Sequence, residues 1–580
     1  MAAIITSKFR FHNSEQFKES FSENAPTNYY MFIGRPSIFA AATTGGTDAA
    51  PPTPVDNRRS EAYNWDDMLA AKKIDTTGVT HAIPRRDLDV SGATTYDMYK
   101  PNYSASNTAT SGATSLFDST FYFMTSAYRI YKVLDNGGVA WTAAEPTSTS
   151  SVPFTVSGYT IKYMATLSTT NVQNFVTPDF IPVSITPESN NNLTSGMLHV
   201  IKLTTAGLFL VGGNAWNVAA DRTVTNVPVR GDGTGALATV TIGGTNGSTD
   251  VRAKISAIAV TLGGAGYTCG AIVAQDIIDQ HQTQHGTVLS FSTTPVFEVI
   301  IGPDGGHGSN PAKELGGHFV LMDTKLQQTE AFDFSVVNDF RQLGILRNPF
   351  AYGTTSAFTS STARQTYAIK MATSSGIFAV DEKITQTIPV QTVSTVTVSG
   401  SIITVNTAAA HQLATGQTVK IAGGTFGGGV TTGHIGSHHI TRVDADTFTF
   451  VVSSSRTPSG SSPTGVSYTT FVPQGIVVEW DASNKILFYV QNPYDNQGTD
   501  ATYKQKIPFS GNSTITGATS SATAVPAIAT SSTINNTVFV SGYTNPELQP
   551  DSGDIIYIEN RKPISRASDQ TEDVKLVVEF

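Results

Sequence analysis

The sequence contains a single cysteine, Cys269, in 580 residues. A lone cysteine excludes an intramolecular disulfide and any cysteine-based metal cluster, which suits a chain that assembles in a reducing cytoplasm. We favour a small buried residue over a reactive thiol as its interpretation. The sequence therefore predicts a fold that depends on neither disulfides nor thiol chemistry.

Charged residues and long apolar runs are also scarce. Only 14% of the residues are Asp, Glu, Lys or Arg, and the formal net charge is −9. This acidic balance argues against a surface that neutralises nucleic-acid phosphates. No segment has the unbroken apolar length of a transmembrane helix, and Ser7, Lys8 and Arg10 interrupt the apolar start at once, so no signal peptide is expected. We expect neither nucleic acid nor a membrane as a partner.

Glycine, proline and small polar residues are abundant instead. The 50 glycines and 27 prolines, with many Ser and Thr, are typical of short strands joined by turns. The chain is longer than a single growing core supports, so several domains are expected. The sequence predicts a mainly β protein, with a multi-layer β-sandwich core, a few short helices and two inserted small β domains.

Runs of β-branched and aromatic residues mark the clearest predicted elements. Strands are predicted at 28–33, 121–134, 158–167, within 351–385, at short intervals over 390–452, and as a hairpin over 475–490. Helical turns are predicted near Phe17 and Phe21 with Ser14 as their cap, over Trp65–Lys73, and at 312–315. Residues 453–467 are expected to be a linker and 510–532 a loop.

The last stretch of the chain is the centre of this interpretation. Asp554–Ile558 and Val574–Phe580 are apolar runs typical of strands, and a polar link joins them. An apolar terminus would fray unless it docked in a sheet, so we expect this end to be structural. Asn560 and Arg561 are predicted at a turn, where Arg561 can fork onto a carboxylate such as Asp569.

Arg85, Arg86 and Asp87 form the densest charge cluster of the N-terminal half, directly after Pro84. An arginine there can fork onto a carboxylate of the same chain or of a neighbouring subunit. The cluster can equally be a solvated turn that contributes little to stability. Asp87 is also a second candidate partner for Arg561.

A glycine-rich loop and a histidine pair are candidates for ligand binding. Gly231–Gly235 lacks the Lys-Ser/Thr and the following helix of a phosphate-binding loop, and Arg230–Asp232 matches an integrin-type tripeptide by chance. His281 and His285 have the i, i+4 spacing of a helical metal-binding pair, but the Glu of the His-Glu-x-x-His arrangement is missing. We predict no metal site and no cofactor.

Four tracts along the chain point together to one family. They are Ala3–Arg10, Ala82–Asp87, Asp339–Pro349 and the ending Glu559–Phe580, with its Glu-Asn-Arg-Lys-Pro-Ile and Ser-Asp-Gln-Thr-Glu-Asp runs. In this order they resemble the gene-eight baseplate wedge protein of T-even-like contractile-tailed phages. The resemblance covers residues 1–205, 318–350 and 550–580, and much of the middle departs from it.

The resemblance implies a non-catalytic structural subunit of a tail baseplate wedge. In that family the β-sandwich subunit is a homodimer and joins other wedge proteins before six wedges close around a hub. It implies wedge subunits as partners, no small-molecule substrate, and a place in the virion tail baseplate after assembly in the bacterial host cytoplasm. The sequence shows no nucleophile elbow, Walker loop or paired-carboxylate signature, so we expect no enzyme.

Departures from the family pattern suggest the domain boundaries. We predict a core over 1–205, an inserted small β domain over 206–285, core again over 286–386, an inserted small sandwich or barrel over 387–473, and core with the C-terminal strands over 474–580. Both insertions begin and end in Gly-, Ser- or Pro-rich stretches, as tolerated insertions do. The residues that we select for structural or interface roles are Arg85, Arg86, Asp87, Arg341, Asn560, Arg561 and Asp569.

A glycan- or receptor-binding tail protein is the alternative from another class. Ser-, Thr-, Gly- and aromatic-rich β modules also bind glycans, and Trp141, Trp216, Tyr267 or Trp480 could stack on sugar rings. Specific binding on a glycan array would favour this alternative. Assembly with wedge subunits and no glycan signal would favour the scaffold.

Overall fold

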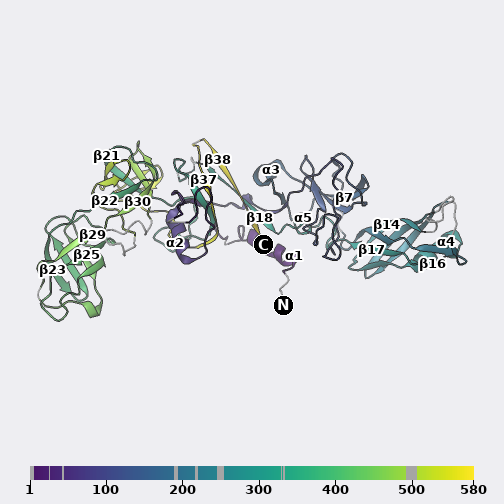
Figure 1. The fold of residues 1–580 in the computed structure, drawn as a ribbon, viewed down its shortest axis with the longest axis horizontal. Helices are drawn as coiled ribbons and strands as arrows, with labels where there is room; N and C mark the ends of the chain where they lie inside the picture. The colour runs from purple at the N-terminus through teal and green to yellow at the C-terminus, as the bar shows by residue number, and fades with distance from the viewer. Residues whose placement is uncertain are drawn as a thin grey trace. The chain divides into compact units, whose positions relative to one another are not determined.

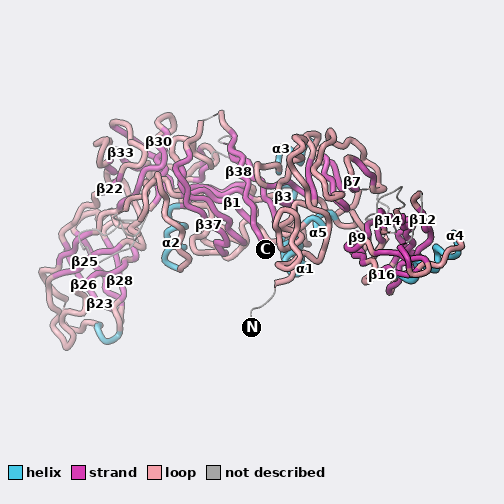
Figure 2. The backbone as a smooth tube through the Cα atoms, turned by 45° about the vertical axis from the view of Figure 1, so that its right-hand side comes forward, coloured by secondary structure: helices cyan, strands magenta, loops and turns pink. Residues whose placement is uncertain are grey.

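The computed structural model divides the chain into two compact units. Unit 1 comprises Met1–Ser20, Thr77–Asp323 and Lys575–Phe580, and unit 2 comprises Phe21–Thr76 and Thr324–Val574. The residues described are 5–24, 26–41, 45–188, 194–215, 220–243, 254–327, 330, 333–460, 462–491, 506–567 and 569–580. Strands and loops make up most of both units, and the helices are short (Figure 1, Figure 2). The predicted mainly β class is confirmed.

Five α-helices occur among these residues. They are α1 (Ser7–Glu19), α3 (Thr169–Phe175), α4 (Ala274–His285) and α5 (Pro311–Leu315) in unit 1, and α2 (Arg58–Asp67) in unit 2. Thr6 caps α1, because its hydroxyl accepts a hydrogen bond from the Phe9 amide at 3.2 Å. The predicted cap, Ser14, lies inside this helix instead. The single turn predicted at 312–315 is present as α5.

The helix predicted over Trp65–Lys73 is wrong. α2 ends at Asp67, and the strand β2 (Met68–Lys73) follows at once and pairs with β1 (Tyr29–Gly34). The first four residues of β2 are buried in succession. A strand that is covered on both faces shows no alternation, so its apolar run looks like one side of a buried helix.

Two sheets form the main part of unit 1. The first has the strand order β38-β18-β3-β8, with β3 (Val79–Pro84), β8 (Phe180–Val183), β18 (Phe319–Gln327) and β38 (Thr571–Glu579). The second has the order β4-β5-β7-β6, with β4 (Tyr122–Met124), β5 (Arg129–Asp135), β6 (Phe154–Val156) and β7 (Tyr159–Thr166). Phe123, Trp141 and Tyr159 pack edge to face in its core. The strands predicted over 121–134 and 158–167 are confirmed, and the final apolar run is docked in a sheet.

A second group of strands in unit 1 spans residues 198–301. It contains β9 (Leu198–Thr205), β10 (Leu208–Val211), β11 (Asn214–Ala215), β12 (Arg222–Gly231), β13 (Thr234–Ile242), β14 (Ile255–Ala265), β15 (Gly270–Ile272), β16 (Ser290–Thr293) and β17 (Val296–Ile301). Its sheets have the orders β14-β13-β12-β15, β17-β9 and β11-β10-β16. Two hydrophobic clusters lie within this group, one around Ile277 and one around Tyr267. Both reach β9 or β17 residues outside 206–285, and the predicted domain boundaries stay a prediction.

Unit 2 is built on a five-stranded and a seven-stranded sheet. The first has the order β20-β2-β1-β19-β37, with β19 (Phe340–Arg347), β20 (Thr362–Arg364) and β37 (Asp554–Ile564). The second has the order β31-β30-β22-β32-β33-β21-β36, with β21 (Tyr367–Ser375), β22 (Lys383–Gln386), β30 (Gln474–Asp481), β31 (Ile486–Val490), β32 (Ile515–Gly517), β33 (Thr523–Pro526) and β36 (Tyr543–Thr544). A short pair, β34 (Thr533–Ile534) and β35 (Thr537–Val538), also belongs to this unit. The strands within 351–385 and the hairpin over 475–490 are confirmed, whereas 510–532 holds two strands rather than only a loop.

A group of strands over 393–470 has a hydrophobic cluster of its own, which includes Val405, Phe448 and Tyr468. Its strands are β23 (Val393–Ser399), β24 (Ile402–Thr407), β25 (Thr418–Ala422), β26 (Gly436–His439), β27 (Thr441–Arg442), β28 (Thr447–Val451) and β29 (Ser467–Thr470). They form the sheets β23-β24-β28-β27 and β26-β25-β29, which lie together in Figure 1. The Thr470 hydroxyl donates to the Ile388 carbonyl at 3.3 Å, so the chain enters and leaves this module at adjacent points.

Candidate interface and structural sites

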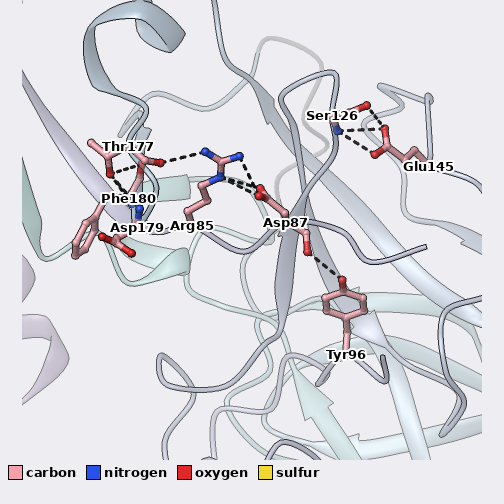
Figure 3. Close-up of polar contacts among 8 residues, drawn as sticks. All are labelled: Arg85, Asp87, Tyr96, Ser126, Glu145, Thr177, Asp179 and Phe180. Carbon is pink, nitrogen blue, oxygen red and sulfur yellow. Dashed lines mark hydrogen bonds and ion pairs between the residues drawn. The ribbon is translucent and has the colours of Figure 1, made fainter. Parts of the chain in front are cut away.

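Arg85 makes a forked ion pair with Asp87 just after β3 in unit 1 (Figure 3). Its Nε donates to Oδ1 at 2.9 Å and to Oδ2 at 3.0 Å, and Nη2 lies 2.9 Å from Oδ2. Nη1 donates to the Thr177 carbonyl at 3.1 Å. The hydrogen bonds that the Arg85 guanidinium donates to the Asp87 carboxylate raise the pKa of Arg85. One side chain thus joins its own turn to the loop before β8.

The backbone around this pair is also held in place. The Arg85 amide donates to the Asp179 carbonyl at 2.7 Å, and the Tyr96 hydroxyl donates to the Asp87 carbonyl at 3.1 Å (Figure 3). The side chains of Arg85 and Asp87 remain 29% and 57% exposed. The Asp87 carboxylate therefore keeps a solvent-facing side while its position is fixed by the chain.

Arg86 has different contacts. Its Nη2 donates to the Phe117 carbonyl at 3.0 Å, and its guanidinium carbon lies 4.6 Å from the centre of the Tyr122 ring, a cation–π distance. The Arg86 carbonyl accepts a hydrogen bond from the Met124 amide at 2.7 Å. This arginine holds the turn after β3 against β4.

Arg341 lies in β19 of unit 2 with only 6% of its side chain exposed. Its Nε donates to Asp48 Oδ2 at 3.0 Å, and its Nη1 donates to the Pro36 carbonyl. Partial burial works to raise the pKa of Asp48, but hydrogen bonds from the Phe39 amide and from Arg341 outweigh it and lower that pKa. Arg341 therefore fastens the loop after β1 to the five-stranded sheet.

Asn560 and Arg561 lie inside β37, not at a turn between two strands as predicted. Asn560 Oδ1 accepts a hydrogen bond from Gln342 Nε2 at 2.8 Å, and its Nδ2 donates to the Pro52 carbonyl at 3.0 Å. Arg561 pairs with Glu559 at 2.8 Å rather than with Asp569, because residues two apart on one strand project from the same face. Arg561 is 48% exposed.

Asp569 is exposed in the turn before β38. The buried carboxylate next to this turn is Glu572 in β38, whose side chain is 9% exposed and lies 3.5 Å from Nη1 of Arg566. Burial raises the pKa of Glu572 and lowers that of Arg566, and the opposite charge of each offsets part of the effect on the other. The sequence analysis did not select Arg566. Its position six residues before Glu572, on the other side of a turn, could have indicated an ion pair.

Arg10 was also missed, and it holds the end of the chain. Its guanidinium donates to the Glu579 carboxylate and to the Phe580 carbonyl. The Phe17 and Phe580 rings lie 5.3 Å apart, and the Phe580 amide donates to the His318 carbonyl at 3.2 Å. Helix α1 therefore clasps the last residues of β38 within unit 1.

A fully buried ion pair joins β5 to α5. Lys132 Nζ lies 2.8 Å from Glu314 Oε2, with the two side chains 0% and 5% exposed, and 3.9 Å from the centre of the Tyr99 ring. Burial lowers the pKa of Lys132, and in the same core it lowers that of Lys162 to about 8 and that of His199 to about 4. This ion pair lies inside the core of unit 1. Lys132 stands in the middle of an apolar strand, and this position is the sequence signal that could have indicated a buried charge.

The charged side chains of the candidate ligand loop bind other residues of the same chain. Arg230 forks onto Asp276 at 2.8 and 2.9 Å, and the Asp232 carboxylate accepts the amides of Thr268 at 2.9 Å and Cys269 at 3.1 Å. Hydrogen bonds from Thr268 lower the pKa of Asp232. Cys269 is exposed, which corrects the expectation of a buried residue, because it lies in the short loop between β14 and β15.

The histidine pair lies on α4 as the spacing predicted. His281 Nδ1 is 3.1 Å from the Thr287 carbonyl and His285 Nε2 is 2.9 Å from the Thr223 carbonyl. Over the described ranges, no group of three or more His, Cys, Asp or Glu side chains is placed to hold a metal ion. The two rings therefore act as hydrogen-bonding groups at the end of a helix.

Three of the four aromatic residues proposed to stack on sugars are at least partly covered. Trp141 is 0% and Tyr267 is 3% exposed. Trp480 is half-buried, with its ring 5.3 Å from that of Phe378. Trp216 lies outside the described residues. The stacking platform that the alternative requires is thus missing at Trp141 and Tyr267.

These features define a mainly β protein whose buried and half-buried charged side chains join its own segments. Within the described part of the chain, no helix is both long and apolar enough to span a membrane. Residues 511–580 match the family described as Bacteriophage T4, Gp8. The predicted resemblance to the gene-eight baseplate family is therefore confirmed for the segment that runs from β32 through β37 and β38. No curated protein matches the chain.

Proposed function

We propose that the chain is a structural subunit of a phage tail baseplate wedge. The observation that carries this proposal is the match of residues 511–580 to the gene-eight family. That segment supplies β37, which is one of the two outer strands of the five-stranded sheet, and β38, which is an outer strand of the sheet β38-β18-β3-β8. Both strands therefore help to build the folds that would present an assembly surface.

A passive role agrees with how the charged residues are used. Arg341, Arg566 and Lys132 are almost fully buried and bind carboxylates or carbonyls of the same chain. Such contacts fix segments relative to one another within each unit. They leave these groups unavailable for proton transfer to a substrate, so we propose no catalysis.

We propose neighbouring wedge proteins and a second copy of this chain as partners. A wedge has to withstand contraction of the tail sheath, so its permanent interfaces should exceed the standard size of about 1,600 Å². The half-exposed Arg85–Asp87 pair is a candidate contact, because its position is fixed before any partner arrives. The subunit would lie in the virion tail baseplate after assembly in the bacterial host cytoplasm.

The test is co-expression of the full chain with the other wedge proteins of the same phage. Sizing and native mass measurements should show a complex of defined stoichiometry that contains this chain. Free chain alone, in the presence of folded partners, would contradict the proposal. A glycan array run on the same preparation distinguishes the alternative, because specific binding without a wedge complex would favour a receptor-binding protein.

A further inference from the structure

Lys132 and Glu314 carry opposite charges in the interior of unit 1, where their side chains are 0% and 5% exposed. The residues around them belong to one hydrophobic cluster, which includes Tyr99, Ala312 and Leu315. Taking two ions out of water costs free energy that their mutual attraction often fails to offset. A reaction that removes both charges is therefore favoured at this place.

The Lys132 amine is placed where it readily gives up its proton. Burial in the middle of β5 lowers its pKa. Lys162 lies directly opposite Lys132 on the neighbouring strand β7, and like charges directly across two strands disfavour each other. An unprotonated lysine amine is a nucleophile, whereas the ammonium form is not. The surroundings of Lys132 therefore favour the reactive form of its side chain.

The two oxygens of the Glu314 carboxylate have different partners. Oε2 lies 2.8 Å from Lys132 Nζ. Oε1 accepts the Gly308 amide at 2.7 Å, the Asn310 amide at 3.3 Å and the Ser309 hydroxyl at 3.4 Å. Fixed donors of this kind stabilise the negative charge that develops on an oxygen when a nucleophile adds to its carbon. Oε1 is thus held as an oxyanion would be, and Oε2 faces the amine as a leaving group.

We propose that Lys132 and Glu314 join through an intramolecular amide bond in the folded chain. Lys132 Nζ adds to Cδ of Glu314, so that the Nζ–Cδ bond forms and the Cδ–Oε2 bond breaks. Two of the three ammonium protons pass to Oε2, which leaves as water, and the two charges cancel without any further reactant. The product ties the middle of β5 to α5 across 182 sequence positions. This inference does not depend on the proposed function.

The experiment is mass spectrometry of the denatured full chain, freshly purified and again after prolonged incubation in the folded state. We expect the parent to be lighter than its sequence by one water molecule. Lys132→Met and Glu314→Ala should each keep the full mass of their own sequence. Lys202→Met is the matched control and should keep the loss of water, because the Lys202–Asp135 pair is about one-third exposed and stays hydrated.

A tryptic peptide map of the parent locates the lost water, and it decides the result even if a variant fails to fold. Trypsin does not cleave after an acylated lysine, so the segments that contain Lys132 and Glu314 should appear as one branched peptide. A succinimide at Asp232–Gly233 or Asp304–Gly305 also loses water, but it gives a linear peptide and mild alkali reverses it. Full sequence mass at both times, or a loss that maps to a linear peptide, would overturn the proposal.

Discussion

Arg341 and Asp48 form an ion pair between residues 293 positions apart, with Nε 3.0 Å from Oδ2. The arginine lies in the tract Asp339–Pro349, which was selected for its resemblance to the gene-eight family. Its contacts join β19 to the loop after β1, so the tract connects two distant segments of unit 2.

Replacing Arg341 by Ala should destabilise unit 2 by roughly 2–4 kcal/mol, because Asp48 and the Pro36 carbonyl lose a largely buried donor. The matched control is Arg347→Ala on the same strand, whose pair with Asp554 is about half exposed and should contribute less than about 1 kcal/mol. Urea unfolding of both variants measures the difference. Equal midpoints would show that the buried pair does not stabilise the loop.

Removing Lys575–Phe580 should lower the melting temperature of unit 1 strongly. The truncation takes away the Arg10 clasp, the Phe17–Phe580 contact and part of β38, which leaves backbone groups of β18 without partners. Arg561→Ala is the comparison, because its exposed pair with Glu559 should contribute about zero. Melting and wedge incorporation of both variants are measured. A truncated chain that matches the parent in both would show that these residues are a tail.

The buried side chains of His81 and His318 should lower the stability of the fold as the pH decreases from about 6.5 to about 4. Burial lowers the pKa of His81 and of His318 to about 4, whereas an unfolded histidine titrates near 6.5. The unfolded state therefore binds more protons in this window, and protonation of the more deeply buried His81 costs roughly 3 kcal/mol once the pH reaches 4.

Urea unfolding at several pH values between 7.5 and 4 measures this loss. His81→Phe should be less stable than the parent at neutral pH but should decline less steeply on acidification, since the phenylalanine ring cannot take up a proton. Parallel declines for the parent and the variant would rule out His81 as a source of the pH dependence.

Deletion of residues 390–470 should leave a soluble, folded chain. The ends of this module meet at the hydrogen bond between Thr470 and Ile388, and the module has its own hydrophobic cluster. A short Gly-Ser linker can therefore close the gap with little strain. Circular dichroism and sizing of the deleted chain provide the measurement. Aggregation at ordinary expression levels would argue against an inserted domain.

The class of fold and the clearest strands could be predicted because they depend on amino-acid composition and on the alternation of apolar and polar residues along the chain. The hairpin over 475–490 and the final strand β38 are examples. The strand β2 could not be told from a helix, since burial on both faces removes the alternation. The polar residues of β37 looked like a turn because an exposed edge strand has few apolar side chains.

The ion pairs were harder to predict than the strands. Arg341 was selected, but nothing in the sequence connects it with Asp48, because a pair so far apart depends on how the sheets assemble. Lys132 and Glu314 are 182 positions apart and escaped notice for the same reason. Arg561 was expected to bind Asp569 or Asp87, whereas its actual partner, Glu559, lies two residues earlier on the same strand.

The meeting of Ile388 and Thr470 has a mechanical consequence for the structural role that we propose. Thr470 lies 82 positions after Ile388, and the hydrogen bond from the Gln386 amide to the Pro473 carbonyl at 3.1 Å closes the same loop. Tension between the flanking strands of unit 2 would pass through this junction, and the module is held to the unit at a second place, where Gln412 and Gln417 bind residues 508–513. Changes in the module away from this junction and from Gln412 and Gln417 should therefore leave the stiffness of the flanking strands unaltered.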